Sequence, residues 1–267
     1  MEKIALFQNI EHIKNISKDI SRIYFGSEFC DYLIPSKKDI YTLVRLRDKR
    51  KVPFSIVTPY TNQRNFHRLA ELLHYLNVNF PEMEVIVNDW GVLNLIKKRF
   101  HNLFIVLGRL LSKQKRGFFT KSKLSGITLI ENLNLKKADI EYLKSSILQN
   151  EFLMKFIEEA GIKRIGLDNV EQGILLKNKN KNIYIDLYYP YIYITTSNYC
   201  LTAPLYKRNN FFSRTDKCDK VCLISSLHEI DVNGKYMLLS GNTQFYFNNQ
   251  FNYVDRNKID RLVEMVL

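Results

Sequence analysis

The sequence predicts an α/β protein built as a TIM-like (β/α) barrel, irregular toward its C-terminal end and carrying a β-rich extension there. Three observations lead to this fold class. The chain has 267 residues, 46% of them hydrophobic, which is enough apolar material for one large core. Short apolar runs alternate with helical patterns along its first half. No GxGxxG or GxxxxGK[ST] motif follows any of these runs, which argues against a nucleotide-binding fold, although an open doubly wound sheet stays possible at this point.

The first half of the chain alternates strand-like and helix-like segments. Apolar runs of four or five residues predict strands, and apolar residues at helical spacing predict the helices between them. Such alternation is typical of βαβ units with parallel strands and right-handed crossovers. The predicted strands are Lys3–Phe7, Arg22–Phe25, Phe54–Val57, Glu84–Val87 and Leu103–Leu107, and the predicted helices are Ile10–Ile20, Lys38–Arg47, Phe66–Leu76 and Gly91–Lys98.

The second half is less regular. Helical patterns, a sixth strand, two aromatic and β-branched runs, an antiparallel region around the turn pair Asn233-Gly234 and a closing helix are expected there. In chain order these are helices Asp139–Leu148 and Glu151–Ala160, strands Arg164–Leu167, Ile183–Tyr188 and Tyr191–Thr196, the antiparallel region Lys220–Tyr253, and the helix Asp255–Leu267. We therefore expect one domain over residues 1–267, in which residues 200–253 form a cysteine-bearing loop and an antiparallel extension packed on the barrel.

The chain is basic, and its charge is unevenly spread. Forty Lys and Arg residues face 27 Asp and Glu residues, a formal net charge of +13. Nine basic residues and no carboxylate lie between Lys97 and Lys123. A stretch of this kind attracts RNA, a smaller anionic ligand or an acidic partner, and the simpler interpretation is a solvated, lysine-rich surface.

The ends of the chain and its hydropathy predict a cytoplasmic protein. The first residues lack a basic segment followed by an unbroken apolar one, as a signal peptide would have. No stretch approaches the roughly 18 uncharged apolar residues of a membrane span.

Four cysteines are the main candidates for a metal site. Cys218 and Cys222 are four residues apart, Cys200 precedes them by 18 residues, and Cys30 follows the second predicted strand. The cytosol keeps thiols reduced, which argues against disulfides. Four thiolates suit zinc or an iron–sulfur cluster. The spacing alone leaves open a third interpretation, four unconnected cysteines that behave as small buried hydrophobic residues.

Four segments carry motifs at the ends of predicted strands or around the cysteines: Ile23–Cys30, Val87–Leu93, Arg164–Asp168, and Cys200–Ala203 followed by Cys218 and Cys222. They resemble segments of the peptidase U-32 (collagenase-like) family, most closely of its anaerobic quinone-hydroxylation members. In that family one strand ends in Tyr-x-Gly-Glu with a cysteine shortly after, another ends in Asn-Asp-x-Gly, and a Cys-Phe-Thr-Ala segment precedes two further cysteines. The protease signature Glu-x-Phe-x-x-Gly-x-x-Cys is replaced by Asp186–Tyr191, and the roughly 40 residues between Arg116 and Arg164 have no counterpart.

The resemblance implies a TIM-like barrel with a 4Fe–4S cluster on Cys30, Cys200, Cys218 and Cys222, with zinc as the alternative metal. It also implies a component of an oxygen-independent hydroxylation or related redox system, working with a homologous protein of the same family as heteromeric partner. An RNA-modifying (hydroxylating) member of the family is the second interpretation. A metal-stabilised binding scaffold or a peptidase-like protein is the third.

Polar residues at the ends of the predicted strands are the candidates for a substrate site. Glu28, Asp89 and Asp168 follow the second, fourth and sixth strands and are candidate catalytic groups, because barrel sites gather at the C-terminal ends of strands. Arg109 and Asn88 are candidate substrate-binding residues, Arg109 through its planar fork of donors. Strand-end caps or salt bridges are an equally good interpretation of these side chains.

Overall fold

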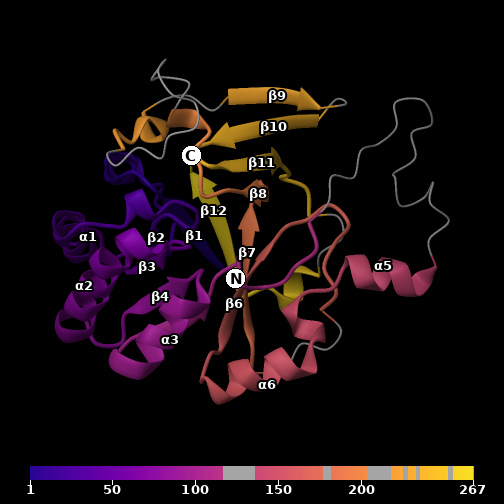
Figure 1. Cartoon of the computed structure of the whole chain (residues 1–267), viewed down its shortest axis with the longest axis horizontal. Coiled ribbons are helices and arrows are strands. Elements are labelled where there is room, and N and C mark those ends of the chain that lie inside the picture. Colours follow the sequence, from indigo (N-terminus) through magenta and orange to yellow (C-terminus); the bar gives the residue numbers. More distant parts are fainter. Residues whose placement is uncertain are drawn as a thin grey trace.

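A computed structural model gives the fold and describes residues 1–116, 136–176, 182–203, 218–224, 228–232, 235–251 and 255–266. Within these residues, eight parallel strands close into a barrel, so the predicted TIM-like fold is confirmed (Figure 1). The order around the barrel is β1-β12-β7-β6-β5-β4-β3-β2. The strands are β1 (Glu2–Phe7), β2 (Arg22–Gly26), β3 (Phe54–Thr58), β4 (Glu84–Val87), β5 (Phe104–Leu107), β6 (Arg164–Asp168), β7 (Tyr184–Tyr189) and β12 (Arg261–Val266).

The eighth strand is a correction to the sequence prediction. The helix expected over Asp255–Leu267 is wrong: a short 3₁₀ helix, η5 (Arg256–Lys258), leads into β12, which pairs with β1 and β7. Apolar residues at 259, 262, 263 and 266 have helical spacing, but the reason for this spacing is not a helix. A strand in a closed barrel is covered on both faces, so it loses the apolar–polar alternation that identifies a half-exposed strand.

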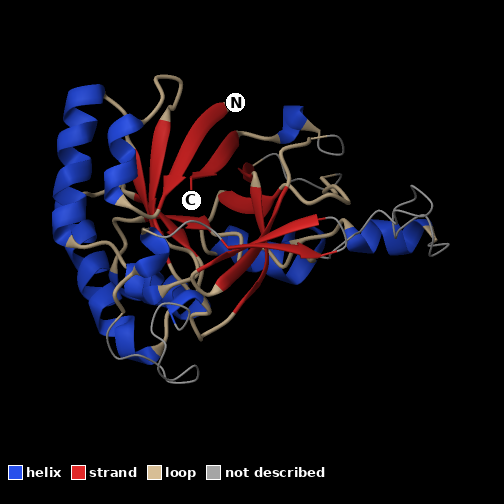
Figure 2. Cartoon of the chain, turned by 90° about the horizontal axis from the view of Figure 1, so that it is seen from above, coloured by secondary structure: helices blue, strands red, loops and turns tan. Residues whose placement is uncertain are grey.

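Helices surround the strands, and in the view from above they gather along the outside of the barrel (Figure 2). Local signals start them: Ser36 forms a capping box with Asp39, and Asn62 accepts hydrogen bonds from Arg64 and Asn65. The α-helices are α1 (Lys37–Arg50), α2 (Gln63–Asn79), α3 (Trp90–Arg99), α5 (Lys137–Leu143) and α6 (Glu151–Glu159). None of the helices among the described residues is long and apolar enough to cross a membrane.

Two predicted helices are shorter than expected. The first crossover contains only a 3₁₀ helix, η1 (Ile10–Asn15), where Ile10–Ile20 was predicted. The helix predicted over Asp139–Leu148 divides into α5 and a second 3₁₀ helix, η3 (Ile147–Gln149), because Ser146 caps a new turn there.

The barrel separates two hydrophobic cores. The larger one lies between the strands and the surrounding helices, and includes Leu69, Leu72, Leu73 and Leu76 of α2. The smaller one fills the barrel itself, and its members inside the strands are Ile4, Leu6, Tyr24, Val57, Ile86, Val106, Tyr188, Val263 and Met265. Side chains alternate between the two cores along each strand, as the pleat requires.

An ionic network closes the N-terminal end of the barrel interior. Arg261 donates to Glu84 at 3.0 Å and to the hydroxyl of Tyr24 at 2.9 Å. That hydroxyl donates to Asp186 at 2.6 Å, and Asp186 also accepts a hydrogen bond from Arg164 at 2.7 Å. Because buried charges are costly unless paired, this network fixes the ends of several strands together.

The C-terminal end of the barrel is covered by an antiparallel sheet, visible above the arrowheads of β7 and β12 in Figure 1. Its strands, in spatial order, are β8 (Tyr191–Thr196), β11 (Thr243–Phe247), β10 (Lys235–Ser240) and β9 (His228–Val232). The ring of Phe29, just after β2, packs against Tyr193 of β8 and Phe245 of β11, with ring centres 5.1 and 5.5 Å apart. The antiparallel region predicted after Lys220 is present, and its predicted turn at Asn233-Gly234 lies outside the described residues.

Candidate functional site

A buried arginine lies at the centre of the covered barrel mouth. Arg109 follows β5, and its side chain is 0% exposed. Two nitrogens of its guanidinium donate to the carboxylate of Glu28. Nε lies 3.0 Å from Oε1 and 2.9 Å from Oε2, and Nη2 lies 2.5 Å from Oε2. Glu28 comes from the segment after β2, so this bidentate pair joins the ends of two strands that are not neighbours in the barrel.

A second carboxylate and a second arginine extend the pair into a chain of four charges. Asp168, the last residue of β6, accepts from Nη1 of Arg109 at 2.7 Å and from Nε of Arg116 at 2.6 Å. Arg116 also donates to the backbone carbonyl of Arg109 at 2.8 Å. We call Glu28, Arg109, Asp168 and Arg116 the mouth network. Two positive and two negative charges balance within it.

Aromatic rings enclose the mouth network. The guanidinium of Arg109 lies 4.6 Å from the ring centre of Tyr188, and that of Arg116 lies 4.0 Å from the ring centre of Tyr193. Cation–π attraction of this kind adds to the ion pairs when the groups are desolvated. Nη1 of Arg109 also donates to the carbonyl of Tyr191 at 3.0 Å, which ties the antiparallel sheet to the barrel.

Burial controls the electrostatics of this region. It raises the pKa of Glu28 above its ordinary value, against the opposing attraction of Arg109. Burial likewise raises the pKa of Tyr188 well above that of a free tyrosine, and the pKa of Tyr193 to about 12. The hydroxyl of Tyr188 has no hydrogen-bond partner among the described residues, although it is completely buried. A closed set of paired charges such as this one stabilises the mouth of the barrel, and its carboxylates are shielded from solvent.

Asn88 and Asp89 make no hydrogen bond or ion pair with the side chains of the mouth network in the described part of the chain. Asn88 is buried at the end of β4, where its amide donates to the carbonyl of Thr58 at 3.0 Å. Asp89 caps α3 by accepting from the backbone of Gly91 and Val92 at 2.7 and 3.0 Å. The structure thus gathers Glu28, Arg109 and Asp168 out of the five candidate substrate-site residues, and gives Asn88 and Asp89 local bonding roles.

Cys30 lies at the edge of the same mouth, at the N-terminus of a 3₁₀ helix, η2 (Asp31–Leu33). Its backbone N–H donates to the hydroxyl of Ser27 at 3.2 Å. The side chain of Asn242, in the turn between β10 and β11, donates to the carbonyl of Phe29 at 2.8 Å. This bond holds the segment of Cys30 against that turn.

The same turn holds the segments of Cys200 and Cys222. The carbonyl of Gly241 accepts hydrogen bonds from the backbones of Leu201 and Thr202 at 3.0 and 3.1 Å, directly after Cys200. A Cβ atom on Gly241 would lie 3.8 Å from the sulfur of Cys222, so the turn and this thiol are in van der Waals range. Cys222 lies in the 3₁₀ helix η4 (Val221–Leu223).

The four thiols influence one another electrostatically. Burial raises the pKa of Cys30 to about 12, and the nearby Cys222 and Cys218 add to the rise. Burial raises the pKa of Cys222 to about 11, with contributions from Cys200 and Cys218. Cys30 and Cys222 line one cavity of about 10 Å³, roughly the space of a single water molecule. The structure therefore brings the four cysteines, from three separate segments, into one neighbourhood.

These thiols do not form a closed single-ion site. In the described part of the chain, no three His, Cys, Asp or Glu side chains are grouped so that they could hold a metal ion. All four cysteines are free and partly exposed. Four thiols are a donor set that suits a thiolate-bound group.

Arg116 and Phe29 are parts of the mouth that sequence reasoning missed. Arg116 belongs to the basic stretch, and nothing in the sequence distinguishes it from its exposed neighbours. Tyr193 and Phe29 carry strand-like and loop-like patterns, and only the closing of the barrel under the sheet brings them to Arg109. Lys121 and Lys123, at the end of the basic stretch, lie outside the described residues.

Comparisons with known proteins give one solved structure and no sequence relative. No family model matches the chain, and no curated protein matches it. The solved structure of the U32 peptidase Mk0906 is similar over 100% of this chain and 93% of that chain, with a TM-score of 0.48 and 8% sequence identity.

Proposed function

We propose that the protein holds an iron–sulfur cluster on Cys30, Cys200, Cys218 and Cys222 and works in an oxygen-independent hydroxylation or related redox system. The observation that supports this most is the turn between β10 and β11, which is bonded to the segments of Cys30 and Cys200 and packs against Cys222. A thiolate-bound centre requires thiols from distant segments to lie close together, and this turn holds three of the segments that carry them. Four unrelated cysteines would have no such requirement.

A 4Fe–4S cluster and a single zinc ion require different spacings of their four thiolates. Zinc with four thiolates places every sulfur about 2.3 Å from one ion, so the sulfurs lie in contact with one another. A 4Fe–4S cluster binds each thiolate to a different iron atom, so its ligand sulfurs are more widely spaced. The resemblance of the cysteine segments to the U-32 family favours the cluster, and zinc remains the alternative that the metal analysis below separates from it.

The surroundings of the thiols supply what a cluster needs from its protein. Burial raises the pKa of Cys222, and the charge of Lys220 opposes that rise. Backbone N–H groups point to two sulfurs, from Ala203 to Cys200 at 3.3 Å and from Lys220 to Cys218 at 3.4 Å. Hydrogen bonds and burial of this kind set the reduction potential of a cluster. When bound, the cluster supplies one-electron chemistry at the rim of the barrel mouth.

The finer proposal follows the resemblance of the cysteine segments to UbiV, the anaerobic quinone-hydroxylation protein. By that analogy the partner is a homologous protein of the U-32 family, as UbiU is for UbiV. Substrate would approach the cysteine side of the sheet, because the carboxylates of the mouth network are buried.

The test is the metal content of anaerobically purified protein. We expect iron and acid-labile sulfide in near-equal amounts, with the broad visible absorption of a cluster that bleaches on reduction. Cys30→Ser, Cys200→Ser, Cys218→Ser and Cys222→Ser should each lose most of the iron, because each thiolate holds one corner of the cluster.

Tyr199→Phe is the matched control. Tyr199 directly precedes Cys200, and the change leaves all four thiols in place, so the iron content should equal that of the unmodified protein. Zinc without sulfide would establish the zinc alternative instead. Full iron retention in Cys200→Ser would remove that residue from the ligand set.

A further inference from the structure

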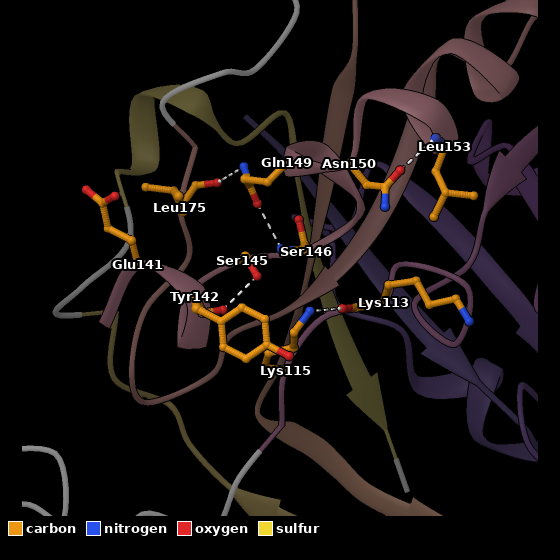
Figure 3. Close-up of a pocket in the computed structure, with 10 residues that line it drawn as sticks. All are labelled: Lys113, Lys115, Glu141, Tyr142, Ser145, Ser146, Gln149, Asn150, Leu153 and Leu175. Atoms are coloured by element: carbon orange, nitrogen blue, oxygen red, sulfur yellow. Dashed lines mark hydrogen bonds between the residues drawn. The ribbon is translucent and has the colours of Figure 1, made fainter. Parts of the chain in front are cut away.

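A pocket of about 600 Å³ lies outside the barrel, between the loop after β5, α5 and the first turn of α6 (Figure 3). A pocket of this size accommodates a small organic ligand. Lys115, Tyr142, Ser145, Asn150, Leu153 and Leu175 are among its lining residues. None of them belongs to the mouth network or to the segments of the four cysteines.

One wall of the pocket carries a positive charge next to an aromatic ring. The ammonium of Lys115 lies 4.8 Å from the ring centre of Tyr142 and 3.4 Å from the carbonyl of Lys113. In Figure 3 this ammonium and the Tyr142 ring lie side by side. Lys115 has no carboxylate partner among the described residues, so its charge is available to a ligand.

The backbone of the loop that carries Lys115 is held in place. Lys113 adopts a left-handed conformation with φ of 52°, which is unfavourable for a residue with a side chain. The amide of Gln172, which is buried, donates to the carbonyl of Lys115 at 2.7 Å and so holds the loop from below. Lys115 therefore projects from a braced loop.

The rest of the lining is partly apolar and partly polar, and it includes Glu141, which has a partner of its own. Leu153 and Leu175 supply the apolar surface. Asn150 uses its carbonyl oxygen to cap α6 at the N–H of Leu153, 2.9 Å away, and its amide N–H groups have no partner among the described residues. A ligand that fills this space has a planar apolar body and an oxyanion directed at Lys115.

We propose that this pocket binds a small planar organic oxyanion, an aromatic carboxylate or phosphate monoester, with its charge on Lys115 and its ring against Tyr142. Part of the basic stretch that the sequence singled out then has a specific use. Arg116 is paired with Asp168 in the mouth network, whereas Lys115, one residue earlier, lines the pocket. The inference is independent of the metal centre, so the pocket binds its ligand in protein without metal as well.

The test is a titration of the full chain with benzoate and with phenyl phosphate, followed by calorimetry or protein-observed NMR. At least one of the two should bind in a saturable manner, and more tightly than benzyl alcohol, acetate or inorganic phosphate, which lack the charge or the ring. Equal binding of acetate and benzoate, or of benzyl alcohol and benzoate, overturns the assignment of the ligand class.

Lys115→Met should weaken the binding by about tenfold or more, the usual effect of losing one charge-assisted hydrogen bond. Leu153→Trp, which fills the pocket and leaves Lys115 in place, should abolish it. The matched control is Lys97→Met, an exposed lysine of the same basic stretch on α3, which should bind as the unmodified protein does. Unchanged binding in Lys115→Met overturns the proposal.

An RNA oligonucleotide titrated in parallel separates the pocket from a polyanion surface. We expect Lys115→Met and Lys97→Met to change RNA binding to the same small degree. If Lys115→Met instead lowers RNA affinity and leaves benzoate and phenyl phosphate unaffected, the residue serves a polyanion surface and the pocket assignment is wrong.

Discussion

Replacing Arg109 by methionine should be among the most damaging single changes that this chain can undergo. The side chain of methionine fills much of the same space but removes the charge. The two carboxylates that Arg109 joins are not affected equally. Asp168 keeps Arg116 at 2.6 Å, whereas Glu28, which is 1% exposed, loses the partner that holds both of its oxygens.

The expected cost follows from that single orphaned carboxylate. Removing one partner of a buried ion pair destabilises a protein by about 3–5 kcal/mol, because the remaining charge stays buried and unpaired. The lost hydrogen bond to the carbonyl of Tyr191 also loosens the antiparallel sheet, so we expect the upper part of this range. Denaturant unfolding of Arg109→Met against unmodified protein gives the value.

The pH dependence has a defined sign. The pKa of Glu28 is already raised by burial, and Arg109 opposes that rise, so removing Arg109 raises this pKa further. A carboxyl with a folded pKa above its unfolded one keeps its stability below the unfolded pKa and loses it as the pH rises through the folded pKa. The penalty should therefore be smaller near about pH 5 than near about pH 7.5.

Two variants complete this experiment. Arg99→Met changes an exposed arginine of α3 and should stay within about 0.5 kcal/mol of unmodified protein. Glu28→Gln combined with Arg109→Met should recover part of the loss, since no orphaned charge remains. A loss below about 1 kcal/mol in Arg109→Met, independent of pH, would show that the mouth network contributes little and refute the reasoning.

Three further changes probe other parts of the fold by the same unfolding measurement. Tyr188→Phe removes a buried hydroxyl that has no partner in the described structure, so stability should stay the same or rise by up to about 1 kcal/mol; a clear loss would reveal a hidden partner. Asp89→Ala removes the cap of α3 and should cost about 1 kcal/mol while leaving the iron content unchanged, and an iron loss would contradict a purely local role. Gly26→Ala should cost about 2 kcal/mol or more, because φ is 134° and the new Cβ would lie 2.2 Å from the carbonyl oxygen of Val57; a tolerated alanine would mean that the end of β2 is free to move.

The sequence was sufficient for the barrel because its strands and helices have separate signals. Short runs that are mostly apolar, such as Glu84–Val87, identify parallel strands, and the helical spacing of Leu69, Leu72 and Leu76 identifies a crossover helix. The signal failed at β12, which is buried on both faces and whose apolar residues imitate a helix. Propensity alone cannot separate these two cases.

The mouth of the barrel could be predicted only in part. Position after a strand identified Glu28, Arg109 and Asp168, because the ends of parallel strands meet in space whatever their order in the chain. That Arg109 would be fully buried between both carboxylates depends on the sheet above it, through Tyr191 and Tyr193 of β8. No local pattern encodes a contact between segments more than 80 residues apart.

The pairing of β12 with β1 gives this molecule a seam that joins Glu2–Phe7 to Arg261–Val266. During synthesis β12 is the last barrel strand to leave the ribosome. Until it inserts, β1 and β7 each present a row of unpaired backbone groups, and such open edges recruit other chains. When β12 inserts, it forms six residue pairs with β1 and also pairs with β7. Both open edges are therefore covered in the same step. A truncated or stalled chain that lacks only this strand should therefore aggregate rather than form a smaller barrel. Closure of the barrel thus depends on β12.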